Sequence, residues 1–304
     1  MSPTPSWLEV HEQVAAALQE ARPVVALESS LITHGLPRPL NGEVAQAMEA
    51  VVRAQAAVPA TIAVLKGRMR VGLTAEELVR LAQEPHARKA TRRDLADCRA
   101  SGATAGTTVA ATAYLAHRAG IQVFATGGIG GVHRGTTGDV SADLPALADT
   151  PIALVCSGAK SILDLPRTIE WLETHSIPVV GWQTDEFPAF FSQTAGIRLS
   201  TKIRSAEEAG RLILAHRELG LTSGILICVP CPEPESIPLD LVERWLMQAL
   251  EETAGVHGGS LTPHVLERMA QISGGATLAA NRALLLHNAA IAAHIAAALL
   301  RNSS

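Results

Sequence analysis

Residues 152–161 read IALVCSGAKS, an apolar run that stops at Ser157 and Gly158 and leads into an amphipathic stretch over residues 162–173. This pattern predicts a strand, a tight turn and a helix, the unit from which layered α/β proteins are built. Ligands of such sheets bind beyond the carboxyl ends of the strands, where Lys160 stands. Desolvation there disfavours the ammonium form, so the amine can act as a covalent nucleophile toward a carbonyl. The alternative is a lysine at a helix start that faces solvent.

Strand-like and helical runs alternate along most of the chain. The expected strands are residues 24–27, 60–65, 122–126, 152–155, 178–181 and 224–228, and the expected helices are residues 7–21, 41–55 with Asn41 as cap, a short one capped by Thr74, 107–119, 163–173 and 205–218. Helices dominate from residue 240 onward. The alternation favours a three-layer α/β/α sandwich with a mostly parallel central sheet and a helical C-terminal region. No repeat or linker divides the chain, so we expect one domain over residues 1–304.

Composition excludes several classes of protein. With 304 residues, 47% of them hydrophobic and 18% charged, the chain can bury a large core. A net charge of −4 and 3% aromatic residues argue against binding of nucleic-acid polymers, which needs basic faces or aromatic stacking platforms. The first residues lack the pattern of a secretory leader, and the alanine-rich residues 288–300 are too short for a membrane span. We therefore expect no membrane association, with these alanines in a buried helix or a subunit contact.

The four cysteines favour a reduced, cytoplasmic protein. Cys228 and Cys231 have the spacing of a redox motif or half a zinc site, but no second cysteine or histidine pair follows nearby. Because Cys228 ends an apolar strand, we expect it to pack as a small hydrophobic residue.

Polar residues follow several of the expected strands. Glu28 ends the run at residues 24–27, where a carboxyl group can serve as general acid or base, or can simply cap the next element. Residues 126–135, TGGIGGVHRG, hold five glycines whose backbone N–H groups can approach an anion, with His133 and Arg134 to complete a phosphate cradle. The alternative for this loop is a flexible surface turn.

Acidic and basic clusters suggest partners for a phosphorylated ligand. Asp139 and Asp143 flank Ser141 at a helix start, and oxygen ligands of this kind suit Mg²⁺ or Mn²⁺. Asp143 could equally be an ordinary first-turn acid. The basic cluster at residues 88–93 could meet a phosphate or remain a solvated surface.

Taken together, these segments closely resemble the pseudouridine-5′-phosphate glycosidase family over nearly the whole chain. The matching segments are residues 27–35, 89–95, 106–112, 127–135, 139–144, 157–164, 184–190 and 278–288. The resemblance implies cleavage of the C–C glycosidic bond of pseudouridine 5′-phosphate to uracil and ribose 5-phosphate, a reversible reaction. It also implies a divalent metal, usually Mn²⁺, and a homotrimer with an α/β/α core.

The resemblance also implies roles for individual residues. The family's nucleophilic lysine falls on Lys160, its proton-transfer glutamate on Glu28 and its metal-site aspartate on Asp139. Its substrate contacts fall on Lys89, Val109, Ser141, Ala142 and Asp143, and Thr126 and His133 are candidates for the phosphate end. Of the four lysines in the chain, Lys66 and Lys202 receive no role.

Two departures from the family pattern bear on substrate affinity and metal geometry. Ala276 follows Gly274-Gly275 where relatives often carry lysine, and the loop at residues 134–138 is short. Two other readings remain open: a Schiff-base lyase or aldolase acting on another sugar phosphate, and a non-catalytic protein that binds a sugar phosphate.

Overall fold

The computed structural model describes residues 5–135, 138–253 and 261–302. The prediction that no leader is present concerned the first eight residues, and the first four of these lie outside the described part. Within these described ranges, eleven strands form the sheet. In spatial order the main path is β1 (Leu8–Val10), β4 (Arg68–Val71), β3 (Val58–Leu65), β2 (Val24–Leu27), β7 (Val123–Ala125), β8 (Ala153–Cys156), β11 (Ile225–Cys228), β9 (Val179–Trp182) and β10 (Thr201–Ile203). β6 (Ala105–Thr107) pairs with β3, and β5 (Arg88–Ala90) pairs with β6.

The seven strands from β3 to β10 along this path are parallel. Their carboxyl ends therefore lie at one edge of the sheet. Strands β2, β7, β8 and β11 are buried along their whole length, as expected for parallel strands covered on both faces. The predicted mostly parallel sheet is confirmed.

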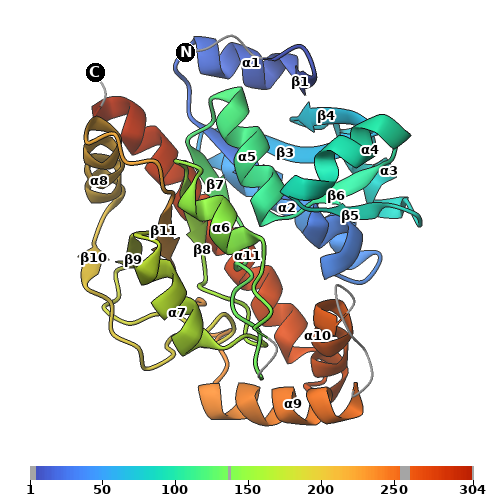
Figure 1. Ribbon diagram of the computed structural model, residues 1–304, viewed down its shortest axis with the longest axis vertical. Helices are drawn as coiled ribbons and strands as arrows, with labels where there is room; N and C mark the ends of the chain where they lie inside the picture. The colour runs from blue at the N-terminus through green and yellow to red at the C-terminus, as the bar shows by residue number, and fades with distance from the viewer. Residues whose placement is uncertain (1–4, 136–137, 254–260, 303–304) are drawn as a thin grey trace.

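Helices cover both faces of this sheet (Figure 1). On one face, α11 (Ala276–Asn302) contacts β2, β7 and β8 and packs between α2 (Leu40–Ala54) and α8 (Ala206–Glu218). On the other face lie α1 (Glu12–Gln19), α5 (Val109–Ala119), α6 (Asp143–Ala148) and α7 (Leu165–Thr174). Shorter elements complete this part of the fold: the π-helix η1 (Leu31–Gly35), α3 (Ala75–Gln83), the 3₁₀ helix η2 (Arg92–Asp94) and α4 (Leu95–Ser101).

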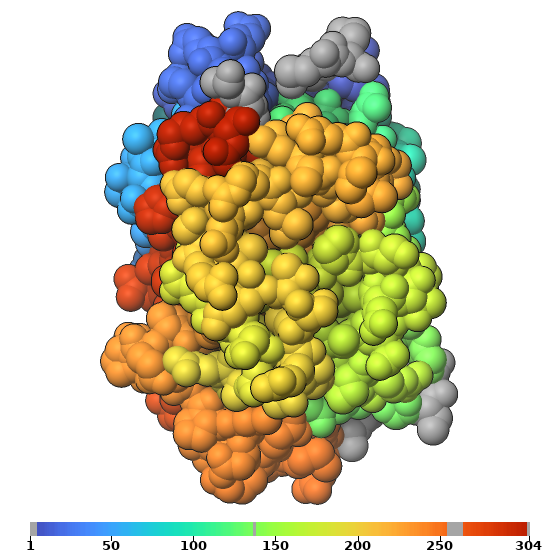
Figure 2. Space-filling view, turned by 90° about the vertical axis from the view of Figure 1, so that its left-hand side faces the viewer, coloured from blue at the N-terminus to red at the C-terminus, as the bar shows by residue number. Residues whose placement is uncertain are grey.

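The C-terminal region is helical, as predicted. Helices α9 (Leu239–Glu252) and α10 (Leu261–Ile272) pack on each other and lie at the end of the molecule opposite the N-terminal segment (Figure 2). One contiguous core includes buried residues from Leu8 to Leu299, which is what a single domain requires.

Helix α11 is longer than the alanine-rich pattern suggested. It has 27 residues, and within the described part of the chain it is the one helix long and apolar enough to cross a membrane. However, 61% of its most apolar window is buried inside the protein, and its neighbours are strands and helices. The prediction that this segment is too short for a membrane span was therefore wrong, whereas the predicted buried helix is observed.

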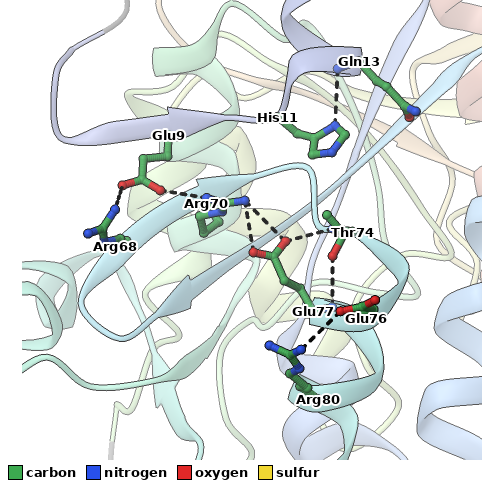
Figure 3. A network of polar contacts seen from close by, with 9 residues as sticks. All are labelled: Glu9, His11, Gln13, Arg68, Arg70, Thr74, Glu76, Glu77 and Arg80. Atoms are coloured by element: carbon green, nitrogen blue, oxygen red, sulfur yellow. Dashed lines mark hydrogen bonds and ion pairs between the residues drawn. The ribbon is translucent and has the colours of Figure 1, made fainter.

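The expected helix at residues 7–21 was wrong in its first third. Residues Leu8–Val10 form β1, which pairs with β4 in parallel, and α1 begins only at Glu12. Figure 3 shows why this edge is stable: the Glu9 carboxylate accepts hydrogen bonds from Arg68 at 2.8 Å and Arg70 at 2.7 Å. Arg70 also pairs with Glu77 at 3.0 Å, which ties the strands to α3. These partners lie about sixty residues away, so the local pattern could not reveal them.

Of three further local predictions, one is confirmed and two changed. Thr74 caps α3 through a capping box with Glu77, as expected. Asn41 does not cap α2, because its buried side-chain amide donates instead to the carbonyls of Ile32 at 2.7 Å and Ala82 at 3.0 Å. Thr107 belongs to β6 rather than to the following helix.

Lys66, which had no role in the sequence, lies in the turn between β3 and β4. Its φ of 50° and the φ of 76° at Gly67 give the left-handed pair that a tight hairpin needs. Lys202 lies exposed on β10.

Candidate active site

Three polar residues meet at the carboxyl edge of the sheet because they follow neighbouring strands. Glu28 follows β2, Thr126 follows β7, and Lys160 lies four residues after β8. They line one cavity with an empty volume of about 560 Å³, including its solvent-open mouth. The other lining residues are Ser30, Leu31, His34, Gly35, Leu36, Lys89, Gly127, Gly128, Phe190, Leu266, Asn281 and Leu285.

The Glu28 carboxyl group is buried and held by two hydroxyl groups. Its residue is 5% exposed, Ser30 donates to Oε2, and Thr126 donates to Oε1. The alternative of a helix cap is excluded, since η1 begins with no side-chain cap bond at Ser30 and both Glu28 oxygens are occupied by these hydroxyls. A carboxyl group held in this way within a cavity is suited to proton transfer.

Lys160 lies on a loop that continues the pairing of β7 with β8. Ser157 N donates to Gly127 O at 2.8 Å, Ile129 N to Gly158 O at 3.0 Å, and Lys160 N to Ile129 O at 3.1 Å. Gly158 has a φ of 80°, and a Cβ there would lie 2.3 Å from the Pro188 carbonyl oxygen. The glycine therefore allows the turn that carries Lys160 back over the strand ends.

The cavity gathers cationic groups near Glu28. Lys89 lies on β5 at the exposed rim, where partial desolvation and then the charge of Lys160 lower its pKa, while the carboxylates of Asp143 and Glu28 oppose that shift. His34 is half-buried, and its pKa is lowered by desolvation and then by the charge of Lys89. An anionic ligand entering this cavity would meet the amino groups of both Lys89 and Lys160.

The predicted substrate-contacting segment 141–143 lies beside the glycine-rich loop. Asp143 is buried and accepts hydrogen bonds from Gly130 N at 2.8 Å and Ala110 N at 2.9 Å. Ser141 contacts Gly130, where a Cβ would lie 2.1 Å from the serine hydroxyl oxygen, and Ala142 is exposed. Both Asp143 oxygens thus hold backbone groups, which makes this residue a support of the loop.

Val109, the remaining predicted substrate contact, is buried at the first position of α5. Within the residues the structure describes, it does not line the cavity with Lys160. Ser141, Ala142 and Asp143 do not line it either.

Asp139 and His133 form a pair outside the cavity. His133 Nε2 lies 3.9 Å from Asp139 Oδ2, and the Asp139 side chain is 63% exposed. Within residues 5–135, 138–253 and 261–302, no group of three or more histidine, cysteine or acidic side chains is placed to hold a metal. One exposed carboxylate suits a hard divalent ion that keeps water ligands and also binds substrate oxygens, but it does not form a closed protein cage.

The two departures from the family pattern can also be placed. Ala276 begins α11 directly after Gly274 and Gly275, both of which have positive φ angles. Residues 136 and 137 of the short loop lie outside the described residues. Arg134, before them, donates to both carboxylate oxygens of Glu243 on α9 at 3.0 and 2.7 Å, so it forms an ion pair rather than part of an open phosphate cradle.

The cysteine motif has no sign of redox or metal chemistry in the structure. All four cysteines are free and buried. Cys228 lies opposite Cys156 in the parallel pair of β11 and β8, and burial raises its pKa. Burial raises the pKa of Cys231 to about 12. The prediction that Cys228 packs as a small hydrophobic residue is confirmed.

Sequence reasoning left several cavity residues without a role. Ser30 and His34 lie within the quoted segment at residues 27–35, but their contribution depends on η1, which turns them toward Glu28 and Lys89. Leu266 and Phe190 come from distant segments, so only the fold brings them here.

The chain is similar to known proteins over almost its whole length. The sequence profile of indigoidine synthase A-like proteins matches residues 13–298. A pseudouridine-5′-phosphate glycosidase of Rhodospirillum centenum is 56% identical over 97% of this chain and 93% of its own length. The chain belongs to this family. Glycosidases of the same name from Sorangium cellulosum and Deinococcus radiodurans are 50% and 47% identical, over 96% and 97% of this chain and 93% and 96% of their own lengths.

Solved structures of the indigoidine synthase A-like family share the fold over almost the whole chain. An indigoidine synthase A-like protein of Thermotoga maritima has a TM-score of 0.89 at 38% identity, covering 97% of both chains. The prealnumycin C-glycosynthase AlnA in complex with ribulose 5-phosphate has a TM-score of 0.91 at 39% identity, covering 98% of this chain and 99% of that one.

Proposed function

We propose that this protein is a pseudouridine-5′-phosphate glycosidase, which reversibly cleaves the C–C glycosidic bond to give uracil and ribose 5-phosphate. The observation that carries the proposal is the meeting of the Lys160 amine and the Glu28 carboxyl group in one cavity, after two strands of the parallel sheet that are separated by β7 alone. Relatives of that name at up to 56% identity support the substrate. The complex of AlnA, a C-glycosynthase, with ribulose 5-phosphate supports a sugar-phosphate site in this fold.

The bond to be broken explains the need for an amine. An N-glycoside can leave on nitrogen with two carboxyl groups as catalysts, whereas a C-glycoside has no such leaving atom. Lys160 attacks C1′ of the sugar, and the ring C1′–O4′ bond breaks as O4′ takes up the proton released by the attacking amine. The nitrogen lone pair of this adduct can then form a C=N bond to C1′ as the bond to the pyrimidine breaks.

Glu28 supplies the proton that the departing pyrimidine carbon requires. The bonds from Ser30 and Thr126 hold its carboxyl group in one orientation in the cavity, which favours transfer in a defined direction. Water then hydrolyses the lysine–sugar iminium to ribose 5-phosphate and free Lys160. Lys89 at the rim is placed to bind the anionic end of the substrate.

Asp139 is the proposed metal-site residue, with Mn²⁺ or another hard divalent ion as the metal. Such an ion supplies Lewis-acid polarisation of an oxygen on the pyrimidine. The carboxylate is exposed and has room for the waters that such ions retain. Uracil release from pseudouridine 5′-phosphate, measured with and without a chelator, tests whether the reaction needs the metal.

Release of uracil from pseudouridine 5′-phosphate, followed by chromatography in the presence of Mn²⁺, tests the activity. A folded, metal-loaded sample that releases none refutes it. Parallel assays with other sugar phosphates separate it from a Schiff-base lyase, and calorimetric binding without turnover would point to a binding protein.

Borohydride trapping with ribose 5-phosphate tests the lysine. We expect mass spectrometry to find the reduced adduct on Lys160, and Lys160→Ala to abolish both labelling and turnover. Lys202→Ala is the matched control, because this exposed lysine on β10 lies outside the cavity, and its labelling and rate should equal those of the unchanged protein.

We further propose a homotrimer, on the family resemblance, and a cytoplasmic location, on the state of the cysteines. Four free, buried thiols suit a reducing compartment. Light scattering coupled to gel filtration measures the subunit count, and a monomer at assay concentration would contradict the trimer.

A further inference from the structure

His34 is a cavity residue that the proposed mechanism leaves without a task. It lies on η1, six residues after Glu28, and lines the same cavity as Glu28, Lys89 and Lys160. The residue is half-buried. A histidine inside a reaction cavity is the usual side chain for proton transfer near neutral pH.

The hydrogen bonds around Thr33 indicate which ring nitrogen of His34 carries the proton. His34 Nδ1 lies 2.7 Å from Thr33 Oγ1, and the Thr33 hydroxyl faces the Ser29 carbonyl oxygen at 3.4 Å. Threonine on a helical turn commonly donates to the carbonyl four residues earlier. With its hydrogen directed to Ser29, Thr33 accepts from Nδ1–H, and Nε2 is left as an unprotonated acceptor.

The position of Thr33 is enclosed by the fold. A Cβ on Gly106 would lie 2.2 Å from Thr33 Oγ1 and 2.7 Å from the Ser29 carbonyl oxygen, so the β6 backbone closes over this pair. Within the described part of the chain, His34 Nε2 has no protein hydrogen-bond partner. Nδ1 is therefore occupied, and Nε2 is the nitrogen free to meet a ligand or water.

Burial and a neighbouring charge favour the neutral form of the imidazole. Helices α2 and α3 and strands β5 and β6 pack against η1, and among their charged groups Lys89 on β5 acts on His34. Desolvation first, and then the Lys89 charge, lower the pKa of His34 below its ordinary value of 6.5. Glu28, the acidic residue that lines the cavity, already accepts bonds from Ser30 and Thr126.

We propose that His34 is a further catalytic residue, whose Nε2 is the general base for hydrolysis of the lysine–sugar iminium. This inference rests on the proposed glycosidase activity. It divides the two proton transfers of the reaction between two groups: Glu28 protonates the departing pyrimidine, and His34 activates the water that frees the sugar.

The step balances without any further reactant. The water oxygen forms a bond to C1′, the π pair of the C=N bond moves to the Lys160 nitrogen, and a water proton moves to Nε2. The resulting carbinolamine then collapses: the proton on Nε2 passes to the amine, the C1′–N bond breaks, and the hydroxyl proton returns to Nε2 as the aldehyde forms. Ribose 5-phosphate leaves, and the proton on Nε2 passes to the Glu28 carboxylate, which had given its own proton to the pyrimidine, so both groups regain their starting forms.

Rapid-quench kinetics of His34→Gln separate this role from a structural one. In the first turnover we expect one equivalent of uracil per subunit at the rate of the unchanged enzyme. Subsequent turnover should slow by about 100-fold, within the usual range for loss of a general base. The adduct on Lys160 should then accumulate and be visible by mass spectrometry without borohydride. His86→Gln, at an exposed histidine outside the cavity, is the control and should change neither phase.

The outcomes are distinct. If His34→Gln slows the uracil burst and the later turnover equally, or changes neither, the proposal is overturned. If the unchanged enzyme releases no uracil, the glycosidase activity itself fails, which is a different result from a normal enzyme with an unaffected His34→Gln variant.

A ¹⁵N NMR titration tests the state of His34 without reference to activity. We expect a neutral imidazole protonated on Nδ1, with a pKa below 6.5 that rises when Lys89→Met removes the neighbouring charge. The base form exists above that pKa, so iminium hydrolysis should fall as pH drops through it. A proton found on Nε2 in the neutral form would overturn the assignment.

Discussion

Replacement of Asp143 by asparagine tests whether this carboxylate supports the glycine-rich loop. Its two oxygens accept bonds from Gly130 N and Ala110 N, and the residue is 6% exposed. An asparagine keeps one acceptor and turns an NH₂ group toward the other N–H, which leaves a buried donor unpaired. A hydrogen bond to a charged group contributes about 1.5–3 kcal/mol, so we expect the free energy of unfolding to fall by about 2–4 kcal/mol.

The corresponding change in melting temperature follows from the size of the chain. An unfolding entropy of about 2.1 cal/mol/K per residue gives roughly 0.6 kcal/mol/K for a chain of this length, and hence a decrease of about 3–6 °C. Circular dichroism melts measure it. Hydrogen exchange at the Gly130 or the Ala110 amide should accelerate at the same time, because one of these two N–H groups loses its acceptor.

Asp149→Asn is the matched control. This aspartate at the end of the same helix pairs with Arg92 at 2.7 Å, but both side chains are about half exposed. Exposed ion pairs contribute about 0.2–1 kcal/mol, so its melting temperature should fall by less than about 2 °C. Equal losses in the two variants, or unchanged exchange at both the Gly130 and Ala110 amides in Asp143→Asn, would refute the supporting role of the Asp143 carboxylate.

Three other predictions concern the frame around the cavity. Gly158→Ala should lower the free energy of unfolding by more than about 2 kcal/mol in urea melts, because the strain of a positive φ adds to the clash with the Pro188 carbonyl oxygen. The control is Gly220→Ala, which has a φ of 70° and nothing within 4 Å, and should lower it by about 1 kcal/mol. Equal decreases would contradict the effect of the Pro188 contact. Glu243→Gln should weaken the two hydrogen bonds from Arg134 and increase proteolytic cleavage within α9. Glu251→Gln, on the same helix, should leave cleavage unchanged. Equal cleavage in the two variants would show that the Arg134–Glu243 ion pair does not hold α9 in place. All four thiols should resist a thiol reagent at pH 8 in the native protein and react once the protein is denatured. The reason is that they are buried and that burial raises the pKa of Cys231 to about 12. Rapid labelling of the native protein would contradict that burial.

Much of the site was predictable because its residues follow strands directly. In a parallel sheet, residues after neighbouring strands converge at one edge, and Glu28, Thr126 and Lys160 do so. Their type and their position after an apolar run are properties of the local sequence. The hydroxyls that hold Glu28 were not predictable in the same way, since Thr126 reaches it across ninety-eight positions of the chain.

The edge of the sheet shows the opposite situation. Residues Leu8–Val10 resemble the start of a helix, but pairing with β4 and the ion pairs of Glu9 with Arg68 and Arg70 make them a strand. These partners are remote in sequence, so tertiary contacts override the local preference. Strands β5 and β6 were not expected either, because each has only three residues and is defined by its pairing with another strand rather than by a local pattern.

The sequence by itself determined the alternation of strands and helices, the parallel core and the identity of an acid and an amine that each follow a strand, because these depend on local periodicity and chemistry. Only the tertiary structure decided that Asp143 spends both oxygens on backbone N–H groups and that His34 faces the cavity of Lys160. It also decided that the apolar helix α11 is covered by the sheet and its neighbouring helices. The physical reason is that hydrogen-bond partners, burial and neighbouring charges are set by residues far apart in the chain.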